Sequence, residues 1–124
     1  MKSMSTTIRL SQIAHARSGD KGNHANIGVI AYTARGFEFL RDVLTAEKLE
    51  QYFVGLGLRR VERFELPRIW ALNFLLYDAL AGGASMSLRI DTQGKLLSTA
   101  LLEMELPAPE DLGAMLRVSG APSV

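Results

Sequence analysis

The sequence contains no cysteine. This absence excludes disulfide bonds, catalysis by a thiol and metal sites built from thiolates. The chain also lacks an excess of either charge, because its 14 lysines and arginines nearly balance its 13 aspartates and glutamates. A surface that follows nucleic-acid phosphates needs a clear basic excess, so we expect no nucleic-acid partner.

Long apolar runs are absent as well. No uninterrupted stretch is long enough to cross a bilayer, and the N-terminal sequence MKSMSTT has no apolar signal core. We therefore expect a cytoplasmic protein with no membrane partner. The 124 residues, 48% hydrophobic and 22% charged, are enough for one domain, 1–124. We place its core at about 6–106 and a tail at 107–124.

What the chain does contain is a dense cluster of turn-forming and charged residues between two apolar runs, at 16–28. Glycine, serine, aspartate and asparagine gather there, and these residues favour tight turns whose backbone N–H groups face outward. Arg17 and Lys21 add positive charge, and the two histidines, His15 and His24, flank the loop. We expect residues 18–23 to form a loop and to be the site of function.

Four interpretations of this loop stay open. Its N–H groups and basic side chains could hold an anion, or Asp20, Asn23 and a histidine could hold a cation. Asp20, Lys21 or His24 could transfer protons, or Asp20 and Asn23 could merely cap their own backbone. The spacing of a Walker A loop is absent, and a strand follows where a dinucleotide fingerprint requires a helix. Since one carboxylate is few for Mg²⁺ or Ca²⁺ and two histidines make no zinc signature, we expect no metal.

A second polar position stands out downstream. Asn73 interrupts the apolar segment 69–80, whose spacing predicts a helix. A buried carboxamide needs hydrogen-bond partners, or it costs on the order of 1–3 kcal/mol. Asn73 therefore either ties this helix to a neighbouring loop or orients a ligand. The turn Gly82-Gly83 that follows could form a second wall of a pocket, although a helix C-cap explains both glycines equally well.

Hydrophobic periodicity and turn signals predict five strands and two main helices. The expected strands are 6–16, 25–32, 59–66, 85–91 and 96–105, and the expected helices are 45–56 and 69–80, with a short helical turn at 37–44. This order predicts an α+β two-layer sandwich of the ferredoxin-like kind, with about five strands and two helices on one face.

Two of these elements carry more specific signals. Thr45 is the expected N-cap of the helix 45–56, with Leu49 and Phe53 on its buried stripe. The strand 59–66 is rich in arginine and glutamate, which places it near an edge of the sheet, where charge discourages unwanted pairing.

The segment 16–31, Ala-Arg-Ser-Gly-Asp-Lys-Gly-Asn-His-Ala-Asn-Ile-Gly-Val-Ile-Ala, resembles the signature of the C-terminal domain of the acyclic terpene utilisation protein AtuA and its relatives. Further matching blocks lie at 44–47, 52–53, 61–67, 71–74, 79–83 and 87–95. The resemblance implies a ferredoxin-like fold. Larger relatives carry a big N-terminal domain before this module, and some act in citronellol and geraniol breakdown through acyl-CoA intermediates. We expect this chain to lack that domain, and the resemblance assigns no catalytic residue.

Together the loop and the resemblance predict an accessory or subunit-type domain. It would bind an anionic small molecule, a carboxylate or an acyl-CoA-like compound, and associate with a larger AtuA-like chain or with itself as a homo-oligomer. No cofactor is expected. The expected ligand-binding residues are Arg17, Ser18, Gly19, Asp20, Lys21, Gly22, Asn23, Asn26 and Asn73.

Two other functions remain open at this point. The chain could be a stand-alone enzyme of the lyase or hydratase type, with Asp20 or His24 as the acid–base group. The loop could instead serve only to close a dimer.

Overall fold

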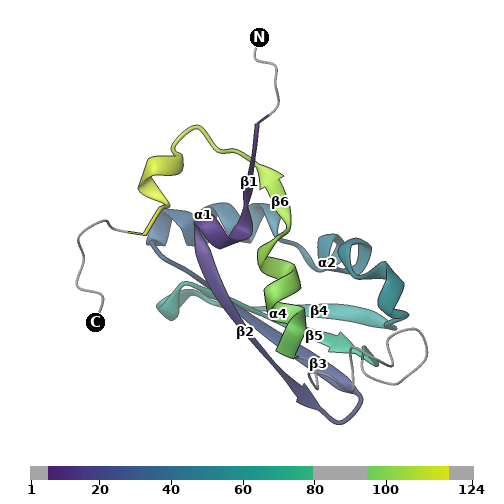
Figure 1. Cartoon of the computed structure of the whole chain (residues 1–124). Coiled ribbons are helices and arrows are strands. Elements are labelled where there is room, and N and C mark those ends of the chain that lie inside the picture. The colour runs from purple at the N-terminus through teal and green to yellow at the C-terminus, as the bar shows by residue number, and fades with distance from the viewer. Residues whose placement is uncertain (1–5, 80–94, 118–124) are drawn as a thin grey trace.

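The computed structural model describes residues 6–79 and 95–117 (Figure 1). Six strands and three helices make up this part of the chain. In chain order they are β1 (Thr7–Arg9), β2 (Ala14–Lys21), β3 (His24–Ala31), α1 (Ala34–Val43), α2 (Ala46–Tyr52), β4 (Arg60–Leu66), β5 (Ala71–Tyr77), α4 (Lys95–Leu102) and β6 (Glu105–Pro107). None of the described helices is long and apolar enough to cross a membrane.

The four longer strands form one antiparallel sheet in the order β2-β3-β5-β4, and β1 pairs with β6 in a separate two-stranded sheet. Burial alternates along β3, where Ala25, Ile27, Val29 and Ala31 are buried and the residues between them are half-buried. Side chains of successive strand residues point to opposite faces, so this alternation identifies a core face and an open face of the sheet.

The three helices cover the core face. In Figure 1, α4 crosses β2 and β3, and α2 lies over β4. Leu40 of α1, Leu49 of α2 and Leu101 of α4 belong to one buried cluster with Ile27 and Phe74 of the sheet. Removing this apolar surface from water is the main stabilising term. The arrangement confirms the predicted α+β class, with helices on one face of an antiparallel sheet.

Several local predictions are confirmed. Thr45 caps α2, because its Oγ1 accepts a hydrogen bond from the N–H of Lys48 at 3.1 Å, and Leu49 and Phe53 are buried. The charged strand is β4, and it lies at an edge of the sheet.

The predicted loop at 18–23 is wrong as a description of the backbone. Residues 18–21 continue β2 and pair with β3 in register, and only Gly22 and Asn23 form the turn of a hairpin. Gly22 has a positive φ of 63°, whereas Asn23 does not, which is the pattern of a type II′ turn. Polar strand residues resembled loop residues because β2 is an edge strand with an exposed side. The predicted strand 6–16 is likewise interrupted, by a 3-10 turn at Leu10–Gln12.

The predicted helix 69–80 is also wrong. A single 3-10 turn, Pro67–Ile69, precedes the strand β5, and Asn73 lies on that strand. Leucine and alanine favour helices in isolation, but β5 pairs on both sides, with β3 and β4. Strands in the middle of a sheet are often apolar throughout, so the periodicity misled the assignment.

The predicted strand 96–105 is a third error, because residues 95–102 form the helix α4. Leu97, Leu101 and Met104 are buried at spacings of four and three, which is a helical period. Alternating small polar residues imitated a strand there. The predicted strand 85–91 and the turn Gly82-Gly83 lie outside the described residues.

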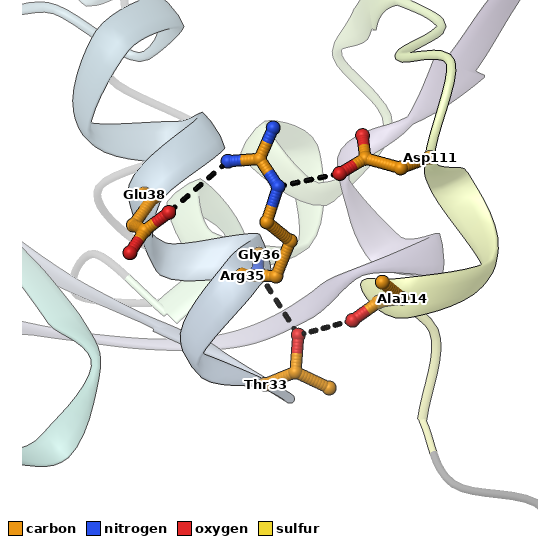
Figure 2. Close-up of polar contacts among 6 residues, drawn as sticks. All are labelled: Thr33, Arg35, Gly36, Glu38, Asp111 and Ala114. Atoms are coloured by element: carbon orange, nitrogen blue, oxygen red, sulfur yellow. Dashed lines mark hydrogen bonds and ion pairs between the residues drawn. The ribbon is translucent and has the colours of Figure 1, made fainter.

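The segment after β6 packs against α1 (Figure 2). The hydroxyl of Thr33 accepts from the N–H of Gly36, which caps α1, and donates to the carbonyl oxygen of Ala114 at 2.8 Å. Arg35 donates to Asp111, and this hydrogen bond holds the pKa of the Asp111 carboxyl below its ordinary value. Met115 is fully buried beside them. Residues expected as a tail therefore belong in part to the packed domain.

Candidate functional site

The open face of the sheet brings together most of the polar residues that the sequence singled out. In an antiparallel sheet, residues that oppose each other on neighbouring strands share a face. Arg17 opposes Gly28, and Gly28 opposes Asn73. One row towards the hairpin turn, Gly19 opposes Asn26. Residues far apart in the sequence thus become neighbours on one surface.

Two glycines leave part of this open face without side chains. A Cβ added at Gly19 would lie 3.4 Å from Oδ1 of Asn26, and one at Gly28 would lie 3.8 Å from Oδ1 of Asn73. The missing side chains help to leave a hollow of about 860 Å³ that extends over the β2 edge. Its described lining residues are Ala16, Arg17, Ser18, Gly19, Asn26, Gly28, Ile30, Asn73 and Ser98.

Two carboxamides form the polar floor of the hollow. Nδ2 of Asn26 donates to Oδ1 of Asn73 at 3.4 Å, and both residues are half-buried. Because Oδ1 of Asn73 is the acceptor in this bond, its Nδ2 group points elsewhere with two N–H donors. Asn73 therefore has the donor chemistry predicted for a ligand-orienting residue, although it sits on a strand.

Arg17 supplies the positive charge. It is exposed on the open face. Among the described residues that line the hollow, Arg17 alone carries a formal charge at neutral pH. A guanidinium beside neutral N–H donors suits an oxyanion.

Other predicted residues face away from this floor. Ser18 lies on the core side, where its Oγ accepts from the N–H of Ser98 at 3.1 Å and joins β2 to α4. Asp20 opposes Ala25, so it points to the core side as well, at an exposed position.

The remaining predicted residues lie at or next to the hairpin turn. Gly22 and Asn23 are exposed at the turn, and the backbone of Lys21 pairs with His24.

His24 lies on the open face at the hairpin end. Its Nδ1 accepts from the N–H of Asp78 at 2.9 Å, and its ring packs edge-on against Tyr77 at 5.1 Å. A neutral imidazole that accepts at Nδ1 carries its proton on Nε2. Asp20 and His24 stand on opposite faces of the sheet and form no acid–base pair.

A cluster that sequence reasoning missed continues from His24 across the sheet. The hydroxyl of Tyr77 donates to Glu62 at 2.8 Å, and this bond raises the pKa of the phenol. The guanidinium of Arg60 lies 4.1 Å from the centre of the same ring. Next to it, a hydrogen bond from Arg59 lowers the pKa of Asp78. The alternating pattern of 60–66 was enough to predict that its residues lie on a strand. The contacts of Tyr77 could be predicted only by recognising β5 as a strand.

No group of three or more His, Asp or Glu side chains that could hold a metal ion occurs within residues 6–79 and 95–117. The family model described as the AtuA ferredoxin-like domain matches residues 8–107. No curated protein and no solved structure matches the chain.

Proposed function

The chain belongs to the AtuA ferredoxin-like domain family, and on that premise we propose that it is an accessory or subunit-type domain that binds an anionic small molecule. The ligand is a carboxylate or an acyl-CoA-like compound, and its site is the hollow on the open face. The domain also associates, either with a larger AtuA-like chain or with a second copy of itself.

One observation carries the ligand site. Arg17, Asn26 and Asn73 come from three different strands, yet they meet over a floor kept low by Gly19 and Gly28. A purely structural hairpin needs glycine at the turn, which Gly22 already provides. The two further glycines lie within strands, where glycine weakens the sheet and often marks a site that a ligand or another backbone approaches closely.

The chemistry of these groups selects an anion. The guanidinium of Arg17 offers paired N–H donors that match the two oxygens of a carboxylate. The amide of Asn73 adds neutral donors. Asp20, the nearby carboxylate in the sequence, faces the other side of the sheet and does not oppose a negative ligand there.

The rim of the hollow fits an apolar group attached to that anion. Ile30 lines it and is half-buried on the open face, while Ala16 lines it from the core side of the β2 edge. Burial of an aliphatic chain here stabilises the complex by roughly 25 cal/mol per Å² of apolar surface removed from water. An acyl carboxylate or thioester combines both features.

Arg17→Ala and Asn73→Ala test the site. We expect Arg17→Ala to weaken binding at least tenfold, because a charge-assisted hydrogen bond contributes about 1.5–3 kcal/mol, and Asn73→Ala to weaken it less. Titration calorimetry would compare a free fatty carboxylate, its acyl-CoA and its uncharged amide. Arg9→Ala is the matched control, since Arg9 is an exposed arginine of β1 paired with Glu103. Equal affinity of wild type and Arg17→Ala for both anions would reject the site.

An enzyme of the lyase or hydratase type is the second candidate, and one observation favours His24 for it. The N–H of Asp78 donates to Nδ1, so a neutral ring carries its proton on Nε2 and can donate a hydrogen bond to a substrate oxygen. Turnover of acyl-CoA or hydroxyacid substrates that is lost in His24→Ala would support this function. Asp20→Asn separates the two acid–base candidates, because Asp20 lies on the other face. A binding domain shows no turnover in any of these proteins.

A further inference from the structure

The outer edge of β4 exposes main-chain groups with a defined pattern. In an antiparallel pair, successive residues direct their N–H and C=O groups alternately towards the neighbour and away from it. Val61 fixes the phase, because its N–H donates to Oε2 of Glu50 on α2 at 3.0 Å rather than to β5. Arg63 and Glu65 therefore direct their main-chain groups outward as well. No main-chain hydrogen bond to these outward groups occurs within the described residues.

The free part of this edge has clear ends. At one end, Glu50 already occupies the N–H of Val61. At the other, Pro67 follows the strand and has no N–H to donate. Between these ends, Arg63 and Glu65 each offer one main-chain N–H donor and one C=O acceptor. Either residue can therefore exchange two hydrogen bonds with the other residue on a second chain.

From this pattern we propose that β4 pairs antiparallel with β4 of a second copy of this chain, about a two-fold axis at Phe64. In this register Arg63 opposes Glu65 of the second copy, and the reverse pair forms on the other side of the axis. Each of these two pairs exchanges both main-chain hydrogen bonds. The two four-stranded sheets become one continuous sheet.

Charge selects this register over its neighbours. Arg63 and Glu65 already form an ion pair at 3.0 Å within one chain, on the core side of β4. A two-fold axis at Phe64 places each of them opposite its counter-ion. An axis at Arg63 would oppose two arginines, and an axis at Glu65 would oppose two glutamates, and like charges directly opposite are destabilising.

The exposed aromatic residue of β4 agrees with the same axis. Phe64 is 38% exposed on the open face, and in this register Leu66, 44% exposed, opposes Glu62 of the second copy. At the axis the two Phe64 residues form a non-hydrogen-bonded pair, the closer type of cross-strand neighbour. Aromatic pairs of this type stabilise antiparallel sheets.

This interface rests on the association part of the proposed function, with the second copy as the partner, and it does not depend on the ligand site. The hollow lies towards β2, on the other edge of the sheet. Ligand affinity and self-association are therefore separate measurements.

The absence of cysteine permits a direct test of the register. In Phe64→Cys the two new thiols lie on the axis, with Cα atoms about 4.5 Å apart, which is within disulfide range. In the matched control Leu66→Cys, of similar exposure, they lie four residues apart along the strand, at roughly 13 Å. We expect rapid, nearly complete disulfide dimer in Phe64→Cys and little in Leu66→Cys under a glutathione buffer. Equal or absent cross-linking in the two variants overturns the register.

Glu65→Pro and Glu65→Ala distinguish the contribution of the main-chain edge to dimer formation from that of the Glu65 side chain. Both remove the carboxylate, but only proline removes the outward N–H, which has no main-chain hydrogen-bond partner within residues 6–79 and 95–117. By sedimentation we expect wild type at twice 13.6 kDa, Glu65→Ala to dissociate more readily, and Glu65→Pro to be monomeric with an unchanged circular dichroism spectrum. A monomeric wild type, or a dimer that survives Glu65→Pro, overturns the proposal. A dimer that survives leaves the association itself in place at another surface.

Discussion

The two edges of the four-stranded sheet are built differently. At the β2 edge, α4 lies against the strand, and the N–H of Ser98 bonds to Ser18. At the β4 edge, Glu50 protects one main-chain group, that of Val61. The β2 edge is rich in small residues, whereas β4 carries alternating charges and an exposed Phe64.

The difference shows how one sheet can separate two roles. Unpaired strand edges are templates for association, so a protein either covers them or marks them with charge. Covering β2 with α4 leaves its other side available for the glycine-floored hollow. On β4, the outward main-chain groups of Arg63 and Glu65 have no main-chain partner among the described residues, and their opposite charges lie two residues apart, so this edge matches a second copy of itself.

Loss of the packing of α4 should have the largest effect on the stability of the fold. Leu101 is fully buried against the core, so Leu101→Ala should lower the free energy of unfolding by about 2–5 kcal/mol. Leu66→Ala on the exposed β4 strand is the matched control and should cost far less. Urea unfolding of both variants, at a concentration where both are monomeric, measures the difference. Similar losses in the two would show that α4 does not hold the β2 edge.

Removal of the Glu50 cap should have an intermediate effect. Glu50→Ala leaves the N–H of Val61 without its partner in a buried residue, at a cost of about 1–3 kcal/mol. Glu50→Gln keeps an acceptor oxygen and should retain most of the stability. Hydrogen exchange of the Val61 amide checks the mechanism, since it should accelerate in Glu50→Ala and change little in Glu50→Gln. Unchanged exchange in Glu50→Ala would contradict the cap.

The smallest effect on stability is expected for the ion pair between Arg59, just before β4, and Asp78. The hydrogen bond from Arg59 keeps the pKa of Asp78 below its ordinary value of 3.8. A carboxyl whose pKa is lower in the folded state stabilises above the unfolded pKa, and that contribution disappears as the pH falls through the folded pKa. Asp78→Asn tolerates the positive φ of 64° at this position and removes the charge.

Urea unfolding of wild type and Asp78→Asn at a series of pH values tests this sign. Wild type should be slightly more stable near neutral pH, and the difference should vanish in acid. A difference that grows as the pH falls would contradict the assignment. High salt should reduce the difference at neutral pH, because the pair is exposed.

Local signals in the sequence were sufficient for some parts of the fold. The Thr45 cap depends on residues within one turn, and the charged strand β4 on its own composition. The segments 69–80 and 96–105 were predicted wrongly for a common reason. Each has a pattern compatible with helix and strand, and the choice depended on distant neighbours, namely β3 and β4 for β5, and the core for α4.

The same distinction between local and long-range information applies to the candidate site. The sequence alone identified Arg17, Asn26 and Asn73 as polar residues in informative places. It could not separate Asn26 from Ser18 or Asp20, because a strand sends successive side chains to opposite faces, whereas the sequence predicts a loop for this segment. The Tyr77–Glu62 bond was likewise out of reach, since it joins two strands across the sheet.

The sequence by itself determined the family, the α+β class, the Thr45 cap and the chemistry available near the hairpin. These follow from residue identity and short-range spacing. Only the tertiary structure decided which of those groups share a face, that Asn73 sits beside Gly28, and that α4 packs along the edge strand β2. It also decided that the other edge strand, β4, keeps outward main-chain groups with no main-chain partner in the described part of the chain. Those outcomes depend on strand order and register, which are fixed by contacts between residues far apart in the chain.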